Sequence, residues 1–204
     1  MPAAPRKVLF VSHVPQPGSV RPQGGAARVL RGLCAELPRL GWDCAAVCPA
    51  EGELTGQLRE AGARVLIFPY AAAGWREPLR TLGDYWRWTR LLRRERPDVL
   101  HTNAVAALGM PVAAAARLGI PALCHTHLAW TPGEIAWAMR GAPAPAGFVF
   151  VSEAQRAESL PHCPPRFAGV PTHVLPNAVA LPATISPPPP GPPWCIGIVG
   201  NLTP

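Results

Sequence analysis

Short, strongly apolar runs alternate along this chain with longer amphipathic stretches, and this alternation restricts its possible folds more than any other feature. Runs such as KVLFVS (7–12) and GFVFVS (147–152) are typical of buried strands, because apolar residues occupy most of their positions. Helical spacing fills the intervals, as at Leu30, Leu33 and Leu37. We therefore expect an α/β fold with a doubly wound, mostly parallel, Rossmann-like sheet of about seven strands.

The same pattern predicts the place of each element. Strands are expected at 7–12, 43–49, 64–69, 98–102, 121–127, 147–152 and 172–177. Helices are expected at 26–40, 53–60, 78–94, 104–118, 132–140 and 153–160. Gly41 should end the first helix, and Pro111 should mark a kink or a restart within the fourth.

A proline run follows the last of these strands. Of the 28 prolines, six fall in PPPPGPP (187–193), which cannot donate backbone hydrogen bonds within a helix or a central strand. We interpret residues 182–193 as a stiff linker that follows a domain at 1–181. Residues 194–204, WCIGIVGNLTP, begin like another buried strand that needs neighbours, so we expect them to open a second domain.

Composition excludes several classes of protein. Hydrophobic residues make up 49% of the chain and charged residues 15%, so the chain can bury a core and is not disordered as a whole. The net charge of +7 accompanies no nucleic-acid-binding motif, and we expect no nucleic-acid partner. No signal-peptide core is visible, and the longest apolar run, 104–116, is too short to cross a bilayer. The six cysteines form no CxxC pair, which indicates free thiols in the cytoplasm.

Polar residues gather where the predicted strands end, and this is the edge at which parallel sheets bind ligands. Gly24 and Gly25 precede a helix N-terminus, where free N–H groups suit a phosphate or a sugar, although a plain turn has the same sequence. Arg28 either adds charge to that site or faces solvent. The other candidate substrate contacts are His101 and Asn103 after the fourth strand, His125 and His127 at the end of the fifth, and Ser152 and Glu153 after the sixth.

His125 and His127 are two positions apart, so both rings are expected on one face of their strand. A His-x-His pair can chelate a metal ion, but no third ligand lies nearby in the sequence, and we expect no metal site. Two interpretations remain open. Each histidine either contacts substrate or is satisfied by hydrogen bonds in a packed strand, and the second fits His127 less well because it lies at the strand end.

The stretch 79–96 predicts a basic amphipathic helix. Helical spacing places Leu79, Leu82, Trp86, Thr89 and Leu92 on one side and Arg80, Arg87, Arg90 and Arg94 on another. Such a helix either packs on the sheet with a solvated basic face or lies on an anionic membrane surface. The second interpretation would make the protein peripheral at the inner face of the membrane.

Six ordered segments resemble the family 4 glycosyltransferases, which are retaining enzymes with the GT-B fold. The family's first strand, GG loop and second strand are matched by RKVLFVS, QGGAARVL and GWDCAAVCP. Its PDVVHTH motif is similar to PDVLHTN, with Asn103 in place of the last histidine, and GIPVVxxxH is similar to GIPALCHTH, which ends at His127. FVFVSEAQRAESL and VLPNAVAL match later segments, with Ala178 and Ala180 replacing a glycine and an aspartate. WCIGIVGNLTP resembles the first strand of the family's C-terminal domain.

The resemblance implies that the chain is the N-terminal, acceptor-side half of a nucleotide-sugar-dependent enzyme, truncated at the start of its donor-binding domain. His127 then corresponds to the family's active-site histidine, with His125 as its neighbour, and Gly24 and Gly25 lie near the donor phosphate or sugar. The nucleotide sugar is a co-substrate, and no further cofactor is implied. Such a half is expected to be inactive unless a separate C-terminal half completes it. The alternative is a free-standing, non-catalytic module that binds a sugar or a partner.

Overall fold

The computed structural model describes residues 5–12, 24–70, 78–104, 109–138, 141–178 and 184. Within these residues, a single sheet of seven parallel strands has the order β3-β2-β1-β4-β5-β6-β7. The strands are β1 (Arg6–Val11), β2 (Trp42–Cys48), β3 (Arg64–Ile67), β4 (Val99–Thr102), β5 (Ala122–Thr126), β6 (Gly147–Phe150) and β7 (Thr172–Val174). The helices are α1 (Gly25–Glu36), α2 (Glu53–Glu60), α3 (Pro78–Glu95), α4 (Gly109–Arg117), α5 (Pro132–Ala138) and α6 (Glu153–Ser159). The α/β fold with a parallel, Rossmann-like sheet is thereby confirmed.

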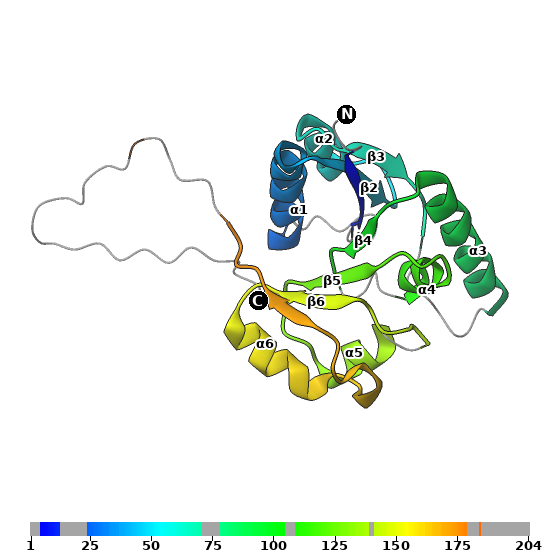
Figure 1. Cartoon of the computed structure of the whole chain (residues 1–204), viewed down its shortest axis with the longest axis vertical. Coiled ribbons are helices and arrows are strands. Elements are labelled where there is room, and N and C mark those ends of the chain that lie inside the picture. The colour runs from blue at the N-terminus through cyan, green and yellow to red at the C-terminus, as the bar shows by residue number, and fades with distance from the viewer. Residues whose placement is uncertain are drawn as a thin grey trace, which may run out of the picture.

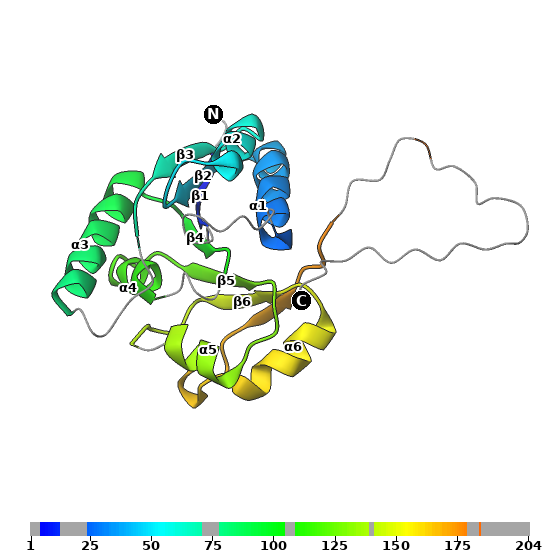
Figure 2. The ribbon, with the colours of Figure 1, turned by 180° about the vertical axis from the view of Figure 1, so that it is seen from behind.

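The strand order reverses beside β1. From β1 the chain moves outward through β2 to β3, and it then returns to place β4 on the other side of β1. Because βαβ crossovers are right-handed, this reversal puts α1 and α2 on one face of the sheet and the later helices on the other. Figures 1 and 2 show α1 and α2 beside β1 to β3, and α5 and α6 beside β5 to β7. The carboxyl ends of β1 and β4 are therefore the edge at which a ligand is expected.

Two apolar clusters join the helices to the sheet, one on each face. Val8 and Phe10 of β1 pack with Leu30 of α1 in the first cluster. Leu9 of β1 belongs to the second cluster, together with Trp88 of α3. Successive residues of β1 thus point to opposite faces that are both buried, which explains why its sequence is apolar at nearly every position.

The first helix ends earlier than its apolar spacing predicted. α1 stops at Glu36, and a short 3-10 helix follows over Leu37–Leu40. Pro38 causes the change, because it has no N–H group to continue the pattern of α-helical hydrogen bonds. Gly41 then ends the 3-10 helix with a φ of 80°, a left-handed conformation that favours glycine, as predicted.

Pro111 is buried in α4, whose described residues begin at Gly109. The predicted kink or restart at Pro111 stays a prediction. The predicted helix began at residue 104, and residues 105–108 of that prediction lie outside the described residues.

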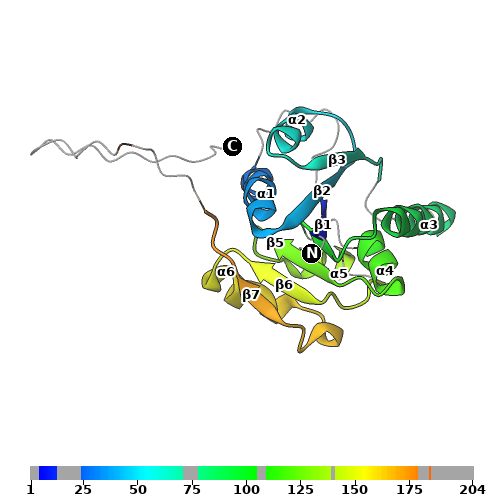
Figure 3. The same ribbon diagram turned by 45° about the horizontal axis from the view of Figure 1, so that its top comes forward.

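The predicted apolar side of α3 is only partly buried, because three of its five members are exposed. Leu79, Leu82 and Trp86 are 85%, 54% and 44% exposed, whereas Thr89 and Leu92 are buried. Two apolar stripes overlap in this helix, and only one of them can face the core. α3 packs against α4 at the outside of the helical layer (Figure 3). The buried residues of α3 are Trp88, Thr89, Leu91, Leu92 and Glu95.

Apart from Thr184, the predicted linker 182–193 and the segment 194–204 lie outside the described residues. The boundaries of the domain at 1–181 and of these two segments stay predictions.

Candidate functional site

Three histidines from two neighbouring strands form a row on the sheet face that α1 covers. His101 lies on β4, His125 lies on β5, and His127 directly follows β5. The ring centroids of His101 and His125 are 5.3 Å apart, and those of His125 and His127 are 4.3 Å apart. Phe10 of β1 closes the row, at 5.0 Å from the His101 ring. Parallel pairing of β1, β4 and β5 thus brings the predicted histidines to one place.

Burial keeps this row uncharged. It lowers the pKa of His101 to about 3 and that of His125 to about 4, and repulsion from neighbouring histidines adds to both shifts. Burial also lowers the pKa of His127. Four ring nitrogens are buried without a hydrogen-bond partner among the described residues, namely Nε2 of His101, both nitrogens of His125 and Nδ1 of His127. Neutral imidazole nitrogens in such a place can exchange hydrogen bonds with the hydroxyl groups of a ligand.

Asn103 joins His127 to the start of α1. Its side-chain Nδ2 donates to the carbonyl oxygen of Ala26 at 2.9 Å, and its Oδ1 lies 3.1 Å from Nε2 of His127. The backbone N–H of Asn103 donates to the carbonyl oxygen of Val11 at 3.0 Å. The carboxyl ends of β1, β4 and β5 and the first turn of α1 therefore meet around one buried amide.

A second set of polar contacts holds the segment after β5. The Thr126 hydroxyl donates to the carbonyl oxygen of Leu128 at 2.9 Å and accepts a hydrogen bond from Nε1 of Trp130 at 3.0 Å. The Gln155 side chain donates to the carbonyl oxygen of Thr126 at 3.2 Å, and Ser159 Oγ accepts from the Trp130 N–H. These groups hold the backbone on both sides of His127, because the contacts lie immediately before and after it.

The sequence predictions did not include this support of His127. One signal was present, since Ser152 and Gln155 have the S-x-x-Q spacing of a helix start. The Ser152 hydroxyl does cap α6 by accepting from the Gln155 N–H at 3.1 Å. The Gln155 carboxamide, however, accepts from the Val151 N–H and donates across to β5, which a local motif cannot specify.

Gly24 and Gly25 lie at the N-terminus of α1, as predicted. Gly24 is the capping residue and has an extended backbone, with φ −68° and ψ 173°. A Cβ atom added to either glycine would meet no atom of the described residues within 4 Å. The packing of these residues therefore does not demand glycine here. Arg28 is exposed on the same helix, and its guanidinium makes no hydrogen bond or ion pair with any described residue.

Ser152 and Glu153 follow β6, the strand next to β5. Glu153 is exposed and forms an ion pair with Arg156, at 2.6 Å between side-chain oxygen and nitrogen. Since the Ser152 side chain is used as a cap, both residues have structural roles in α6. Their assignment to substrate binding stays a prediction, and they do not join the histidine row.

Metal binding has no support in the described parts of the chain. No group of three or more His, Cys, Asp or Glu side chains within them is arranged to hold a metal ion. The polar groups that meet where the strand order reverses, at the switch point of the sheet, are thus neutral imidazoles, one carboxamide and a helix N-terminus. Such groups can bind hydroxyl groups and an anion without a metal.

Comparison with known families and structures gives a consistent result. The family model of Glycosyltransferase Family 4 matches residues 23–181. Anabaena HepE, solved in complex with UDP and glucose, superposes with a TM-score of 0.61 at 17% identity, over 85% of this chain and 45% of that one. WaaB, a lipopolysaccharide outer core galactosyltransferase, gives 0.62 at 14% identity, over 90% and 49%. MurG of Acinetobacter baumannii gives 0.53 at 16% identity, over 88% and 47%.

The chain spans less than half the length of each of these three proteins. At these identities the superpositions show a shared fold. No curated protein sequence gives a significant match to the chain.

Proposed function

The chain belongs to glycosyltransferase family 4, and on that premise we propose that it is the acceptor-side, N-terminal domain of a retaining, nucleotide-sugar-dependent glycosyltransferase. The acceptor is a glycan, a lipid or a small molecule. The observation that carries the proposal is the uncharged His127, held by Asn103 beside the N-terminus of α1 at the switch point of the sheet. This edge is the one at which open α/β sheets bind their ligands.

Each group at this edge has a defined part in the proposed reaction. The N–H groups after Gly24 and Gly25 bind the donor phosphate or sugar, favoured by the positive end of the helix dipole. His127 forms a hydrogen bond to the transferred sugar and holds it in position, and His101, Asn103 and His125 complete that wall of the site. The leaving diphosphate assists the acceptor hydroxyl, so His127 contributes by orientation and not as an obligatory base.

The donor nucleotide is expected to bind mainly to a second α/β domain. HepE, of which this chain matches 45%, was solved with UDP and glucose. The test is to read the coding sequence beyond Pro204 and to assay the encoded protein with a panel of nucleotide sugars. A second α/β domain with a Glu-x7-Glu motif, followed by sugar transfer, would support the proposal. Lack of transfer with every donor by the protein carrying such a domain would contradict it.

We also propose that α3 docks the protein on an anionic membrane surface, as a peripheral protein of the cytoplasmic face. The outer face of α3 carries the exposed side chains of Leu79, Leu82 and Trp86 in its first half. Helical spacing continues the same face with Arg90 and Arg93 in the second half, both of them exposed. An apolar half followed by a cationic half suits insertion beside anionic headgroups. Among the described residues, no helix is long and apolar enough to span a bilayer.

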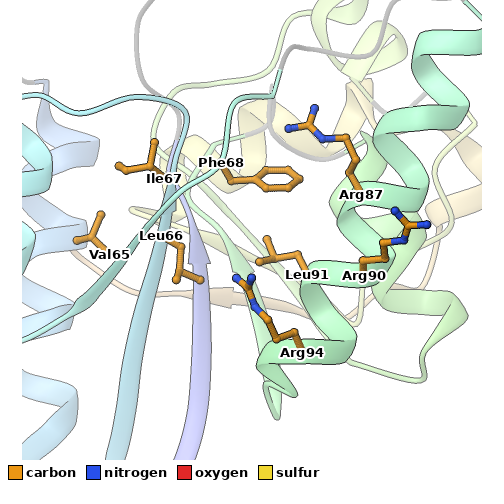
Figure 4. Close-up of a pocket in the computed structure, with 8 residues that line it drawn as sticks. All are labelled: Val65, Leu66, Ile67, Phe68, Arg87, Arg90, Leu91 and Arg94. Carbon is orange, nitrogen blue, oxygen red and sulfur yellow. The ribbon is translucent and has the colours of Figure 1, made fainter.

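A basic groove next to this face supports the docking proposal. A cavity of about 390 Å³ lies between β3 and α3, with Arg87, Arg90 and Arg94 on its α3 wall (Figure 4). The Arg87 guanidinium donates hydrogen bonds to the Asp84 carboxylate and to the Pro69 carbonyl oxygen, and the Arg94 guanidinium donates one to the Glu95 carboxylate. The Arg90 guanidinium has no hydrogen bond or ion pair with a described residue, so it is available to a lipid phosphate.

The docking proposal predicts a salt-sensitive association with vesicles. Replacing Arg90→Gln and Arg93→Gln together is expected to weaken binding to phosphatidylglycerol vesicles by roughly 10- to 30-fold, since each arginine near such a surface contributes about 1 kcal/mol. Vesicle sedimentation at low and high salt measures the effect. The matched control, Arg31→Gln with Arg39→Gln, removes the same charge from exposed positions elsewhere and should bind like the unaltered chain. Equal binding to neutral vesicles would refute the docking proposal.

A further inference from the structure

We propose that Asn103 is a positioning residue that holds the His127 ring in a single tautomer, with the proton on Nε2 and with Nδ1 as a free hydrogen-bond acceptor. The use of that acceptor for a sugar hydroxyl rests on the function proposed above. The tautomer itself follows from the contacts of Asn103, so the two can be tested separately.

The orientation of the Asn103 carboxamide follows from its contact with α1. The Ala26 carbonyl oxygen can only accept, so the Asn103 atom 2.9 Å away must be the NH2 group. The other side-chain atom is then the oxygen, which can only accept. Since this oxygen lies 3.1 Å from Nε2 of His127, that nitrogen must carry the proton and donate it.

Asn103 is itself held too firmly to reverse this arrangement. The residue is buried, and its backbone N–H is bonded to Val11 at the end of β1. A flip of the carboxamide would face its oxygen toward the Ala26 carbonyl oxygen, and two acceptors cannot share a hydrogen bond. That hydrogen bond would be lost whichever nitrogen of His127 carries the proton, and in a buried place an unpaired polar group costs about 1–3 kcal/mol.

The ring is neutral, so one nitrogen has a proton and the other does not. Burial lowers the pKa of His127, and the titratable groups packed around it are His125 beside it and His101 beyond. No hydrogen bond or ion pair joins the ring to a carboxylate of the described residues. With the proton on Nε2, the lone pair of Nδ1 remains, and Nδ1 is the nitrogen that has no partner.

The bond to Ala26 also ties the ring to the helix that begins at Gly25. Asn103 and Ala26 are 77 positions apart, and Asn103 and His127 are 24 apart. One amide therefore sets the distance between the proposed phosphate-binding helix end and the proposed sugar-binding histidine. A change at Asn103 should disturb both the orientation and the protonation of His127.

The experiment is long-range ¹H–¹⁵N NMR on the 204-residue chain with labelled histidines, recorded from pH 5 to pH 8. The His127 signals are assigned by their loss in His127→Gln. We expect the unaltered chain to show a protonated Nε2 and an unprotonated Nδ1 throughout the upper part of this range. Protonation on Nδ1 instead would overturn the proposal.

Two variants test the role of Asn103 itself. Asn103→Leu keeps the branched skeleton of the side chain but removes both hydrogen bonds, and the His127 ring should then populate both tautomers. In Asn103→Asp, a carboxylate beside Nε2 favours the charged ring, and the pKa of His127 should rise by about one unit or more. Asn177→Asp adds the same charge at an exposed asparagine and should leave His127 unchanged. A His127 spectrum that neither Asn103 variant alters, while both remain folded by circular dichroism, would overturn the proposal.

Discussion

Replacing His127→Ala is expected to lower the rate of sugar transfer by about 100-fold in the enzyme that contains this domain, because misplaced reactants lose that much through orientation alone. The histidine is proposed to hold the transferred sugar through one hydrogen bond from a rigid position. Asn103 holds its Nε2, and the contacts of Thr126 and Trp130 hold the backbone around it. Alanine removes the sugar contact but leaves this support in place, so the fold should persist. Steady-state transfer rates and thermal unfolding measure the two effects.

His173→Ala is the matched control for that variant. His173 lies on β7, is exposed, and makes no contact with the histidine row. Its loss should leave the transfer rate unchanged. A transfer rate in His127→Ala equal to that of the unaltered enzyme would show that His127 has no part in the mechanism. It would leave the family assignment unaffected.

Mild acid is expected to destabilise the domain by about 2 to 3 kcal/mol between pH 7.5 and pH 5.5. The pKa of buried His101 is about 3 and that of buried His125 is about 4, whereas both are near 6.5 in the unfolded chain. As the pH falls below 6.5, the unfolded chain therefore takes up protons that the folded one does not. The two histidines do not reduce the free energy of unfolding above pH 6.5, and they lower it progressively as the pH falls toward 4. Urea unfolding at the two pH values measures the difference.

Between pH 7.5 and pH 5.5 the change in stability comes from the histidines, because the buried carboxylate of Glu95 titrates at lower pH. Burial opposes ionisation of Glu95, but hydrogen bonds from Arg64 and Arg94 outweigh it and lower the pKa of that carboxyl. The contribution of Glu95 to the free energy of unfolding is therefore lost only as the pH falls below 4.5, the ordinary pKa of a glutamate. This range lies outside the interval from pH 7.5 to pH 5.5. His101→Met or His125→Met should each lower the pH dependence by about 1.4 kcal/mol, half of what these two histidines contribute, and His173→Gln should leave it unchanged. A free energy of unfolding that is constant from pH 7.5 to pH 5.5 would disprove the buried, neutral row.

The parallel sheet was predictable because its signals are local. Seven apolar runs of strand length, separated by helical spacing, were enough to place every strand within a few residues of its observed bounds. Gly41 was recognisable as a stop because the left-handed turn after a helix favours glycine. The spacing of α3 was ambiguous, since it contains two apolar stripes. The choice between them depends on the neighbouring helix α4 and on the core, which a helical period does not contain.

The candidate site divides in the same way. The sequence alone indicated the α/β class and the likeness to family 4 glycosyltransferases. It also placed polar residues at strand ends, namely His101, Asn103, His125 and His127. Each of these signals lies within a short segment of the chain. Only the tertiary structure decided that Asn103 contacts both Ala26 and His127 and that the histidines are buried and neutral. It also decided that the Gln155 side chain forms a hydrogen bond with the Thr126 carbonyl oxygen. Those contacts join residues from separate strands and helices. Their hydrogen bonds and pKa values depend on burial and on distance in space, which the order of residues along the chain does not specify.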